Sequence, residues 1–363
     1  MRIHHLLLVA SLALVACDHG EHRNEGEGGY GLAPLPGGGS GGCAPLTTCS
    51  ADTCGEQPDR CGGTLDCGSC ARELLAADLP ALGLLEPGPD GHLYWSQPGE
   101  DDGGEVLLRM PARGGDVESV ARSESFTAIA FTPLHLWSTN WAAKTVERMP
   151  LDGGALEVVA EQQGLPHLIA VAGDWIYWVG YVGNAARASL VDGRVETFGA
   201  TFGDGGGGSV QSLLVTGDRL VVLTSDGGIY EAPLDVSEWT TLQHPIEGEF
   251  GFHEGLAADD RHFHWMEGNG GKILRLPRIG GTAEILHDEG RYTTGLALVE
   301  GFLYWSTRDG IRRMPADGGE PEEVVRSFVP RHLVADETHL YWAGTEPRPG
   351  EEDRYALYRL PLP

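Results

Sequence analysis

One motif recurs seven times between residue 73 and the end of the sequence. The full motif has an apolar strand, a turn, an aromatic pair or its equivalent, a loop, an Arg-x-Pro strand end, a Gly-rich turn and an acidic strand with Val or Leu, and most copies keep most of these parts. The pairs that mark the second strand are Tyr94-Trp95, Leu136-Trp137, Tyr177-Trp178, Val221-Val222, His264-Trp265, Tyr304-Trp305 and Tyr341-Trp342. Four short strands in a period of about forty residues are typical of a β-propeller. We therefore predict an all-β, seven-bladed propeller.

The aromatic pairs also indicate how the sheets pack. Neighbouring residues of a strand point to opposite faces of its sheet, yet both members of each pair are large and apolar. Both faces must therefore be covered, as they are when blades pack against one another. The third strands mostly end in Arg-x-Pro, and the repetition of this Arg argues against a single active site. We expect it to stack or pair between blades near the bottom rim; the residues are Arg109, Arg148, Arg275, Arg313 and Arg359.

The count of outer strands predicts how the ring closes. Six fourth strands follow third strands; they are Glu118-Ser119-Val120, Glu157-Val158-Val159, Val195-Glu196-Thr197, Thr240-Thr241-Leu242, Glu284-Ile285-Leu286 and Glu323-Val324-Val325. The last repeat stops after its third strand. The seventh acidic strand, Glu73-Leu74-Leu75-Ala76, precedes the first aromatic pair. We infer that residues 72–77 supply the outer strand of the last blade, which pairs an edge that an open ring would expose.

The Tyr-Trp pair and the downstream Asp-Gly turn resemble the YWTD propellers of the low-density lipoprotein receptor family and related bacterial repeats, over residues 71–363. The residue after Trp is Ser, Val, Met or Ala here and never Thr-Asp, and there are seven copies where that receptor family has six blades. The resemblance implies the fold and a habit of binding, without a specific ligand. The motifs of WD40 and sialidase propellers are absent from the sequence.

The N-terminus predicts export and lipidation. A short basic leader precedes an apolar run from Leu6 to Val15, which is too short to span a bilayer and indicates a signal peptide, residues 1–16. Leu14-Val15-Ala16-Cys17 matches the lipobox of bacterial lipoproteins, so we expect cleavage before Cys17 and acylation of this cysteine. The prediction is a chain anchored in the cell envelope and facing the periplasm or the exterior. The choice between inner and outer membrane stays open.

Two further segments precede the repeats. Residues 17–42 hold the predicted acylation site and a linker rich in Gly and acidic residues, which has too few apolar residues to form a core. Residues 43–70 contain six cysteines in an exported context, which predicts three disulfides with an undetermined pairing. They are Cys43, Cys49, Cys54, Cys61, Cys67 and Cys70. We expect this segment to be a spacer, with a small protein- or carbohydrate-binding unit as the alternative.

The net charge restricts the partners. The sequence has 53 acidic against 25 basic residues, a formal charge of -28. Such a chain repels nucleic acid and anionic lipid surfaces, so we expect neither as an electrostatic partner. Membrane attachment must then come from the lipid anchor, and the chain is expected to be a monomer.

The top face is defined by the loops that join second to third strands and outer strands to the next inner strand. These loops vary in length, which is typical of a binding face. Ring closure brings the acidic loops of the first and last blades together, where Asp101, Asp102, Glu351 and Asp353 are a candidate Ca²⁺ site. A solvated rim that keeps the protein soluble is the alternative. Trp141 lies in a top loop and is a candidate contact for a sugar or protein; burial against a neighbouring loop is the alternative.

The residues that begin the inner strands are expected at the mouth of the central channel. His253 and Glu254 are candidates for proton transfer, with His167 or His332 as a further base or metal ligand if the protein is an enzyme. One polar residue per blade at a wet mouth needs no catalysis to explain it. The histidines beside the short bottom turns are assigned a surface role; they are His92, His135, His262 and His339.

Taken together, the sequence predicts a membrane-anchored, exported propeller that binds a protein or glycan through its top face. No cofactor is expected, apart from Ca²⁺ or another divalent metal. One alternative is an assembly scaffold of the periplasm or outer membrane, and another is a metal-dependent lyase or lactonase-like hydrolase at the channel mouth.

Overall fold

The computed structural model describes residues 72–99, 103–199, 208–244, 253–290, 293–326, 329–346 and 354–362, without the side chains of Glu254 and Glu346. It also describes the backbone of two short antiparallel strands, β1 (Glu56–Pro58) and β2 (Thr64–Asp66). The predicted signal peptide, Cys17, the linker and the six cysteines lie outside the described residues. Within those ranges, no helix has the length and the apolar character needed to cross a membrane.

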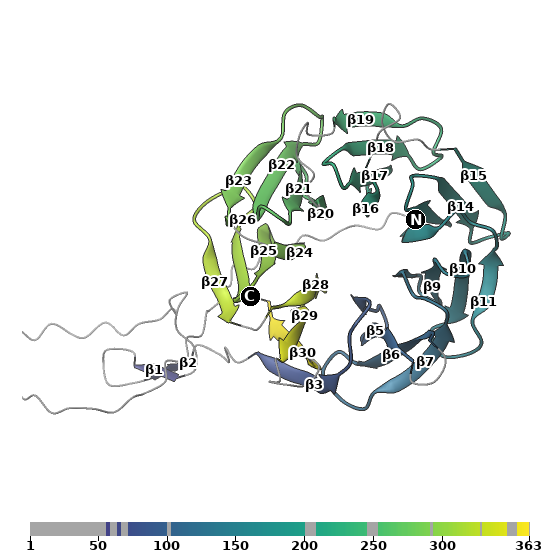
Figure 1. Ribbon diagram of the computed structural model, residues 1–363. Coiled ribbons are helices and arrows are strands. Elements are labelled where there is room, and N and C mark those ends of the chain that lie inside the picture. Colours follow the sequence, from purple (N-terminus) through teal and green to yellow (C-terminus); the bar gives the residue numbers. More distant parts are fainter. Residues whose placement is uncertain are drawn as a thin grey trace, which may run out of the picture.

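The repeats form seven four-stranded antiparallel sheets within the described residues, arranged as the blades of a ring (Figure 1). The inner strands are β4 (Leu85–Pro87), β8 (Ala128–Phe131), β12 (Pro166–Ala172), β16 (Val210–Thr216), β20 (His253–Ala258), β24 (Thr293–Val299) and β28 (Arg331–Ala335). The second strands are β5 (His92–Pro98), β9 (His135–Asn140), β13 (Trp175–Gly180), β17 (Arg219–Thr224), β21 (His262–Glu267), β25 (Phe302–Thr307) and β29 (His339–Glu346).

The two remaining positions of each blade follow the same order. The third strands are β6 (Glu105–Pro111), β10 (Thr145–Pro150), β14 (Ala185–Ser189), β18 (Ile229–Pro233), β22 (Lys272–Pro277), β26 (Gly310–Pro315) and β30 (Arg354–Pro361). The outer strands of blades one to six are β7 (Glu118–Ser123), β11 (Glu157–Ala160), β15 (Val195–Phe198), β19 (Thr240–Gln243), β23 (Glu284–Asp288) and β27 (Glu322–Arg326). The predicted all-β, seven-bladed propeller is therefore confirmed.

The seventh blade is closed by the first strand of the repeat region. Strand β3 (Glu73–Leu79) pairs antiparallel with β30, and Figure 1 shows it as the outer strand of that blade. Glu73 lies opposite Arg359, whose Nε donates to its Oε2 at 2.8 Å. The predicted closure is confirmed, although the strand extends two residues beyond Ala77. The register shifts after Leu74 and again after Ala76, which leaves extra residues in β3, so that Leu79 lies opposite Tyr355.

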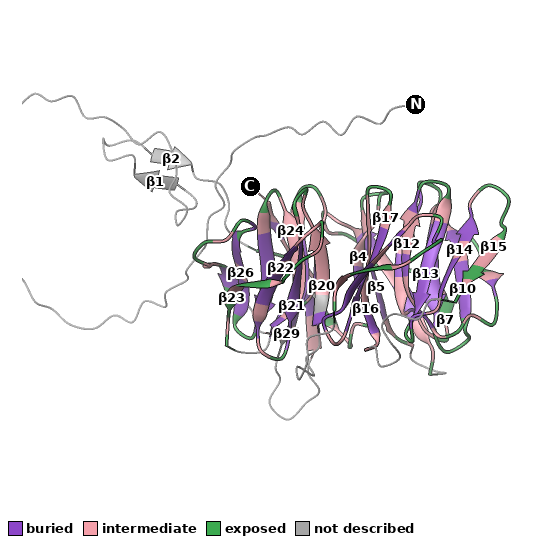
Figure 2. Ribbon diagram, turned by 90° about the horizontal axis from the view of Figure 1, so that it is seen from above, coloured by how far each residue is buried: buried purple, intermediate pink, exposed green. Residues whose placement is uncertain are grey.

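The core lies between the blades. The aromatic pairs are buried; Tyr304 and Trp305, for example, are 1% and 0% exposed. Trp305 of blade six packs in one cluster with Met266 and Ile273 of blade five. Figure 2 shows the consequence, with buried residues in the middle of the strands and exposed residues at the turns of both rims. Both faces of the sheets are covered, as the aromatic pairs predict.

The register of blade two corrects one prediction. Trp137 lies opposite Arg148, as Tyr94 lies opposite Arg109, so Trp137 occupies the Tyr position of the repeat. Ser138 then occupies the Trp position, and the assignment of Leu136-Trp137 as the aromatic pair is wrong by one residue. The error reverses the faces, because successive side chains of a strand point to opposite sides.

The repeated arginine connects neighbouring blades. Arg109 Nη1 donates to the Leu151 carbonyl of the next blade at 2.8 Å, and Arg359 Nη1 donates to the Ala112 carbonyl of blade one at the same distance. Arg187, which is not followed by Pro, makes the same contact with the Leu234 carbonyl at 2.7 Å. Glutamates of the outer strands accept from the same guanidinium groups, as Glu118 does from Arg109. The predicted pairing between blades is confirmed for Arg109, Arg275 and Arg359.

Candidate functional site

The top face carries an exposed apolar surface formed by Trp141, Tyr181 and Val182, which we call the aromatic patch. These residues are 51%, 42% and 69% exposed. Trp141 lies in the β9–β10 loop and Tyr181 in the β13–β14 loop, at equivalent positions of blades two and three. Their rings lie nearly parallel, with centroids 6.4 Å apart and an angle of 15° between the planes. The patch is an exposed apolar surface to which a partner can contribute apolar contacts.

Hydrogen bonds hold the Trp141 loop in place. Asn140, at the end of β9, accepts from the backbone N–H of Ala143 at 2.9 Å through its side-chain oxygen. The N–H of Trp141 donates to Thr127 Oγ1 at 3.3 Å. The loop ends at Lys144, which has a positive φ of 59°, and its carbonyl accepts from the N–H of Gln163 at 2.9 Å. Trp141 is thus fixed on a loop that is tied to the start of two blades.

The Tyr181 loop is fixed in a similar way. The N–H of Tyr181 donates to the Leu165 carbonyl at 3.1 Å, and the Tyr181 carbonyl accepts from Val210 of blade four at 3.0 Å. A tight turn with a bond from Gly183 to the Gly180 carbonyl, at 2.8 Å, completes the loop. Because the backbone under both rings is already held by hydrogen bonds, these loops lose less conformational entropy when a partner binds.

His167, one of the residues predicted at the channel mouth, lies beside this surface. Its ring meets that of Tyr181 edge to face, with centroids 5.5 Å apart. Burial lowers the pKa of His167 below its usual value, so the imidazole is neutral near pH 7. A neutral imidazole both donates and accepts hydrogen bonds. The structure therefore places Trp141 and His167 around the same residue, Tyr181, which the sequence analysis did not single out.

The other channel-mouth candidates lie in different surroundings. His253 is fully buried and accepts a hydrogen bond from Trp265 Nε1 at its Nδ1, at 3.2 Å. His332 has a positive φ of 52° at the place where the two preceding blades have Gly255 and Gly295, and burial lowers its pKa. The side chain of Glu254 lies outside the described part of the chain, as do all four residues of the candidate Ca²⁺ site. In the part that the structure describes, neither His253 nor His332 belongs to a group of three potential metal ligands.

Such a group lies on the bottom face instead. Asp259, His262 and His264 are the three residues of this kind that the described ranges bring together. The sequence analysis assigned His262 a surface role and used His264 only as a member of an aromatic pair. Neither assignment pointed to Asp259, because its contact with His264 depends on the conformation of the β20–β21 turn.

Glu86, on the innermost strand of blade one, is the one acidic residue among the seven equivalent positions of the inner strands. Glu86 of β4 lies opposite Tyr94, and the residues at the same position of blades two to seven are Ala130, Ala170, Leu214, Ala257, Ala297 and Val334. Burial raises the pKa of Glu86 to about 7. The side chain keeps partial contact with solvent. Glu86 therefore titrates near neutral pH within an otherwise apolar ring of positions.

The fold places the chain in the class of seven-bladed β-propellers. No family model matches the sequence, and no curated protein matches it. Among solved structures, the chain is similar to the AfRom2 CNH domain, with a TM-score of 0.59, 14% identity, and coverage of 80% of this chain and 99% of that one. The Myceliophteria thermophila Cps50 (Swd1) beta-propeller domain gives a TM-score of 0.55 at 11% identity, with 79% and 99% coverage.

A third similar structure is the computationally designed Ika8 protein, with a TM-score of 0.52, 14% identity, and coverage of 76% of this chain and 84% of that chain. At these identities the similarity concerns the fold alone. The resemblance to YWTD propellers stays a prediction.

Proposed function

We propose that this protein is an exported lipoprotein whose propeller binds a partner protein through the aromatic patch of its top face. The observation that carries the proposal is the exposed, nearly parallel pair of Trp141 and Tyr181 on two ordered loops. Trp and Tyr contribute disproportionately to protein interfaces, because they bury a large apolar area with few rotatable bonds. β-Propellers commonly act as protein-binding modules.

The chemistry of the patch favours a protein ligand over a glycan. Parallel aromatic rings alone suit either ligand, because a sugar ring also packs on an aromatic face. Val182, which is 69% exposed beside Tyr181, adds an aliphatic surface with no hydrogen-bonding group. Such a residue contributes to binding by burying apolar area, which a protein side chain provides more readily than a hydroxyl-rich sugar.

Replacing Trp141 or Tyr181 by Ala tests this proposal. Truncating a central aromatic residue of an interface costs about 2 kcal/mol, so each variant should bind its partner about 30-fold more weakly. The measurement is the recovery of partner proteins from detergent-solubilised envelopes of the native host, followed by titration of the partner that is recovered. A glycan array is run in parallel.

The matched control for these variants is Val191→Ala, an exposed apolar residue (78%) in the β14–β15 turn of the bottom face. Its binding should equal that of the wild type. If the Trp141 and Tyr181 variants lose glycan binding and keep their protein partners, the patch binds a sugar and not a protein. Unchanged recovery of every partner would refute the proposal.

The proposed anchor is tested separately through Cys17→Ser. Several acyl chains anchor a protein durably, since each buried methylene contributes about 0.8 kcal/mol, and the serine variant accepts none of them. The mature protein should move from the membrane fraction to the soluble fraction when envelopes are separated by ultracentrifugation. A serine variant that still sediments with the membrane would overturn the proposed anchor and leave the proposed binding face untouched.

A further inference from the structure

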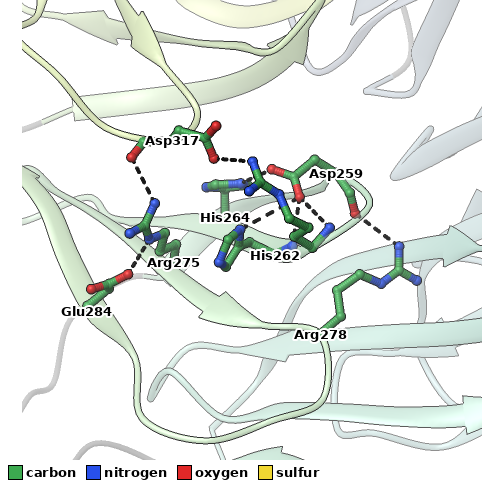
Figure 3. Close-up of polar contacts among 8 residues, drawn as sticks. Asp259, His262, His264, Arg275, Arg278, Glu284 and Asp317 are labelled. Atoms are coloured by element: carbon green, nitrogen blue, oxygen red, sulfur yellow. Dashed lines mark hydrogen bonds and ion pairs between the residues drawn. The ribbon is translucent and has the colours of Figure 1, made fainter. Parts of the chain in front are cut away.

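The β20–β21 turn of blade five brings together one carboxylate and two imidazoles. The potential ligand atoms of Asp259, His262 and His264 all lie within 4.8 Å of one another. Figure 3 shows the three side chains converging near Arg275 and its partner Glu284. The His264 side chain has no exposed surface, whereas those of His262 and Asp259 are 18% and 24% exposed. The group is thus buried at His264 and partly exposed to solvent at His262 and Asp259.

The turn itself orients the carboxylate. Asp259 Oδ1 accepts hydrogen bonds from the backbone N–H groups of Arg261 and His262, both at 2.7 Å. The other oxygen, Oδ2, lies 2.9 Å from His264 Nε2. Oδ1 is also 3.8 Å from His262 Nδ1, a buried nitrogen with no hydrogen-bond partner among the described residues. Backbone amides thus hold one oxygen of Asp259 and aim the other at His264.

The equivalent turn of blade seven binds a tyrosine in place of the second imidazole. Asp336 Oδ1 accepts from the N–H groups of Thr338 and His339, at 2.7 and 2.8 Å, and its Oδ2 accepts from the Tyr341 hydroxyl at 2.7 Å. Blade one has the same contact between Tyr94 and Asp90, at 2.8 Å. Blade five keeps the Asp and the first His and replaces the Tyr by His264. The replacement exchanges a phenol for a second imidazole.

The separations fit a transition metal ion. Zn²⁺ binds imidazole nitrogen and carboxylate oxygen at about 2.0 to 2.2 Å, so tetrahedral ligands lie about 3.3 Å apart. The separations are 2.9 Å from Oδ2 to His264 Nε2 and 3.8 Å from the other carboxylate oxygen, Oδ1, to His262 Nδ1, and the whole group lies within 4.8 Å. Two imidazoles and one carboxylate also form a donor set that suits Zn²⁺ better than Ca²⁺ or Mg²⁺.

The two arginines beside the three ligands are both paired with carboxylates. The nearby guanidinium groups of Arg261 and Arg275 are paired with Asp317 and Glu284, which reduces their repulsion of a cation.

We infer that Asp259, His262 and His264 form a Zn²⁺ site on the bottom face of blade five. His264 would bind the ion through Nε2 as the neutral tautomer that carries its proton on Nδ1, and water would complete the coordination on the exposed side. The site lies on the face opposite to the aromatic patch and does not depend on the proposed function. Its role is to cross-link the turn to strand β21.

The test compares the mature full-length protein, purified without a histidine tag and stripped with a chelator, with two variants that exchange the residues of blades five and seven. His264→Tyr restores the residue of blades one and seven and should fold like the wild type. Tyr341→His gives blade seven the ligand set of blade five. Zn²⁺ is added, excess is removed by desalting, and bound metal is counted by elemental analysis.

Relative to the wild type, His264→Tyr should hold one Zn²⁺ fewer, and Tyr341→His should hold one more. Saturating Zn²⁺ should raise the melting temperature of the wild type by about 5 °C more than that of His264→Tyr. Cysteines and N-terminal histidines that bind zinc contribute equally to all three proteins and cancel in the differences. Equal zinc contents in the wild type and a folded His264→Tyr variant, as judged by circular dichroism, would overturn the inference.

Discussion

A chain that begins at Pro80 is expected to melt about 10 °C below one that begins at Arg72, and to associate at concentrations where the longer chain is monomeric. Removing β3 takes Leu75, Ala76 and Leu79 away from the cluster that joins blades seven and one. The loss of this apolar contact is of the order of 3 to 5 kcal/mol. In a domain of this size, each kcal/mol shifts the melting temperature by about 2 to 4 °C.

Association follows from the edge that the truncation exposes. Strand β30, Arg354–Pro361, pairs with β3 on one side and with β29 on the other. Without β3 it presents unpaired backbone groups, and its Arg359 loses the carboxylate of Glu73. Unpaired strand edges recruit other chains. Size-exclusion chromatography and differential scanning calorimetry on both chains measure the two effects; equal melting temperatures and equal sizes would contradict closure by β3.

The second large effect concerns Glu86, whose replacement by Gln is expected to stabilise the protein at pH 8. The pKa of this carboxyl rises from 4.5 in the unfolded chain to about 7 in the folded protein, because burial disfavours its charged form. Between these values the folded state binds more protons than the unfolded state. Below pH 4.5 the Glu86 carboxyl is neutral, and its burial does not lower the free energy of unfolding. As the pH rises from 4.5 to about 7, the free energy of unfolding falls.

A shift of this size corresponds to roughly 3 kcal/mol, and partial contact with solvent reduces the expected gain to about 2 kcal/mol. Glu86→Gln should therefore raise the melting temperature by about 5 °C at pH 8 and leave it nearly unchanged at pH 4.5. Glu161→Gln, the same substitution at an exposed position, is the matched control. A gain in the Glu86 variant that is the same at both pH values would show that ionisation is not its cause.

The sequence alone was sufficient to predict the ring because each strand type recurs with its own markers. Counting outer strands identified β3 as the missing seventh, since residues 73–76 carry the acidic and apolar pattern of a fourth strand. The register of blade two could not be predicted in this way. Leu136, Trp137 and Ser138 include only one aromatic residue, and the pairing of Trp137 with Arg148 decides which face it occupies.

The candidate site was only partly predictable. Trp141 was recognised by its place in a top loop, while Tyr181 was missed, although it occupies the equivalent position one repeat later. Comparing loop residues between successive repeats would have found it. His253 is buried and accepts a hydrogen bond from Trp265, which lies on the next strand of the same blade. A polar residue at the start of an inner strand does not reveal whether it faces the channel or the neighbouring strand.

The most direct test of the proposed binding face uses two valines of one blade. Val182 in the β13–β14 loop and Val191 in the β14–β15 turn flank the same strand, β14, on opposite faces of the ring, and they are 69% and 78% exposed. A photo-crosslinking amino acid is introduced at either position, and intact cells of the native host are irradiated. The account predicts a specific protein adduct from position 182 and none from position 191. Adducts from position 191 alone, or the same adducts from both positions, would contradict it.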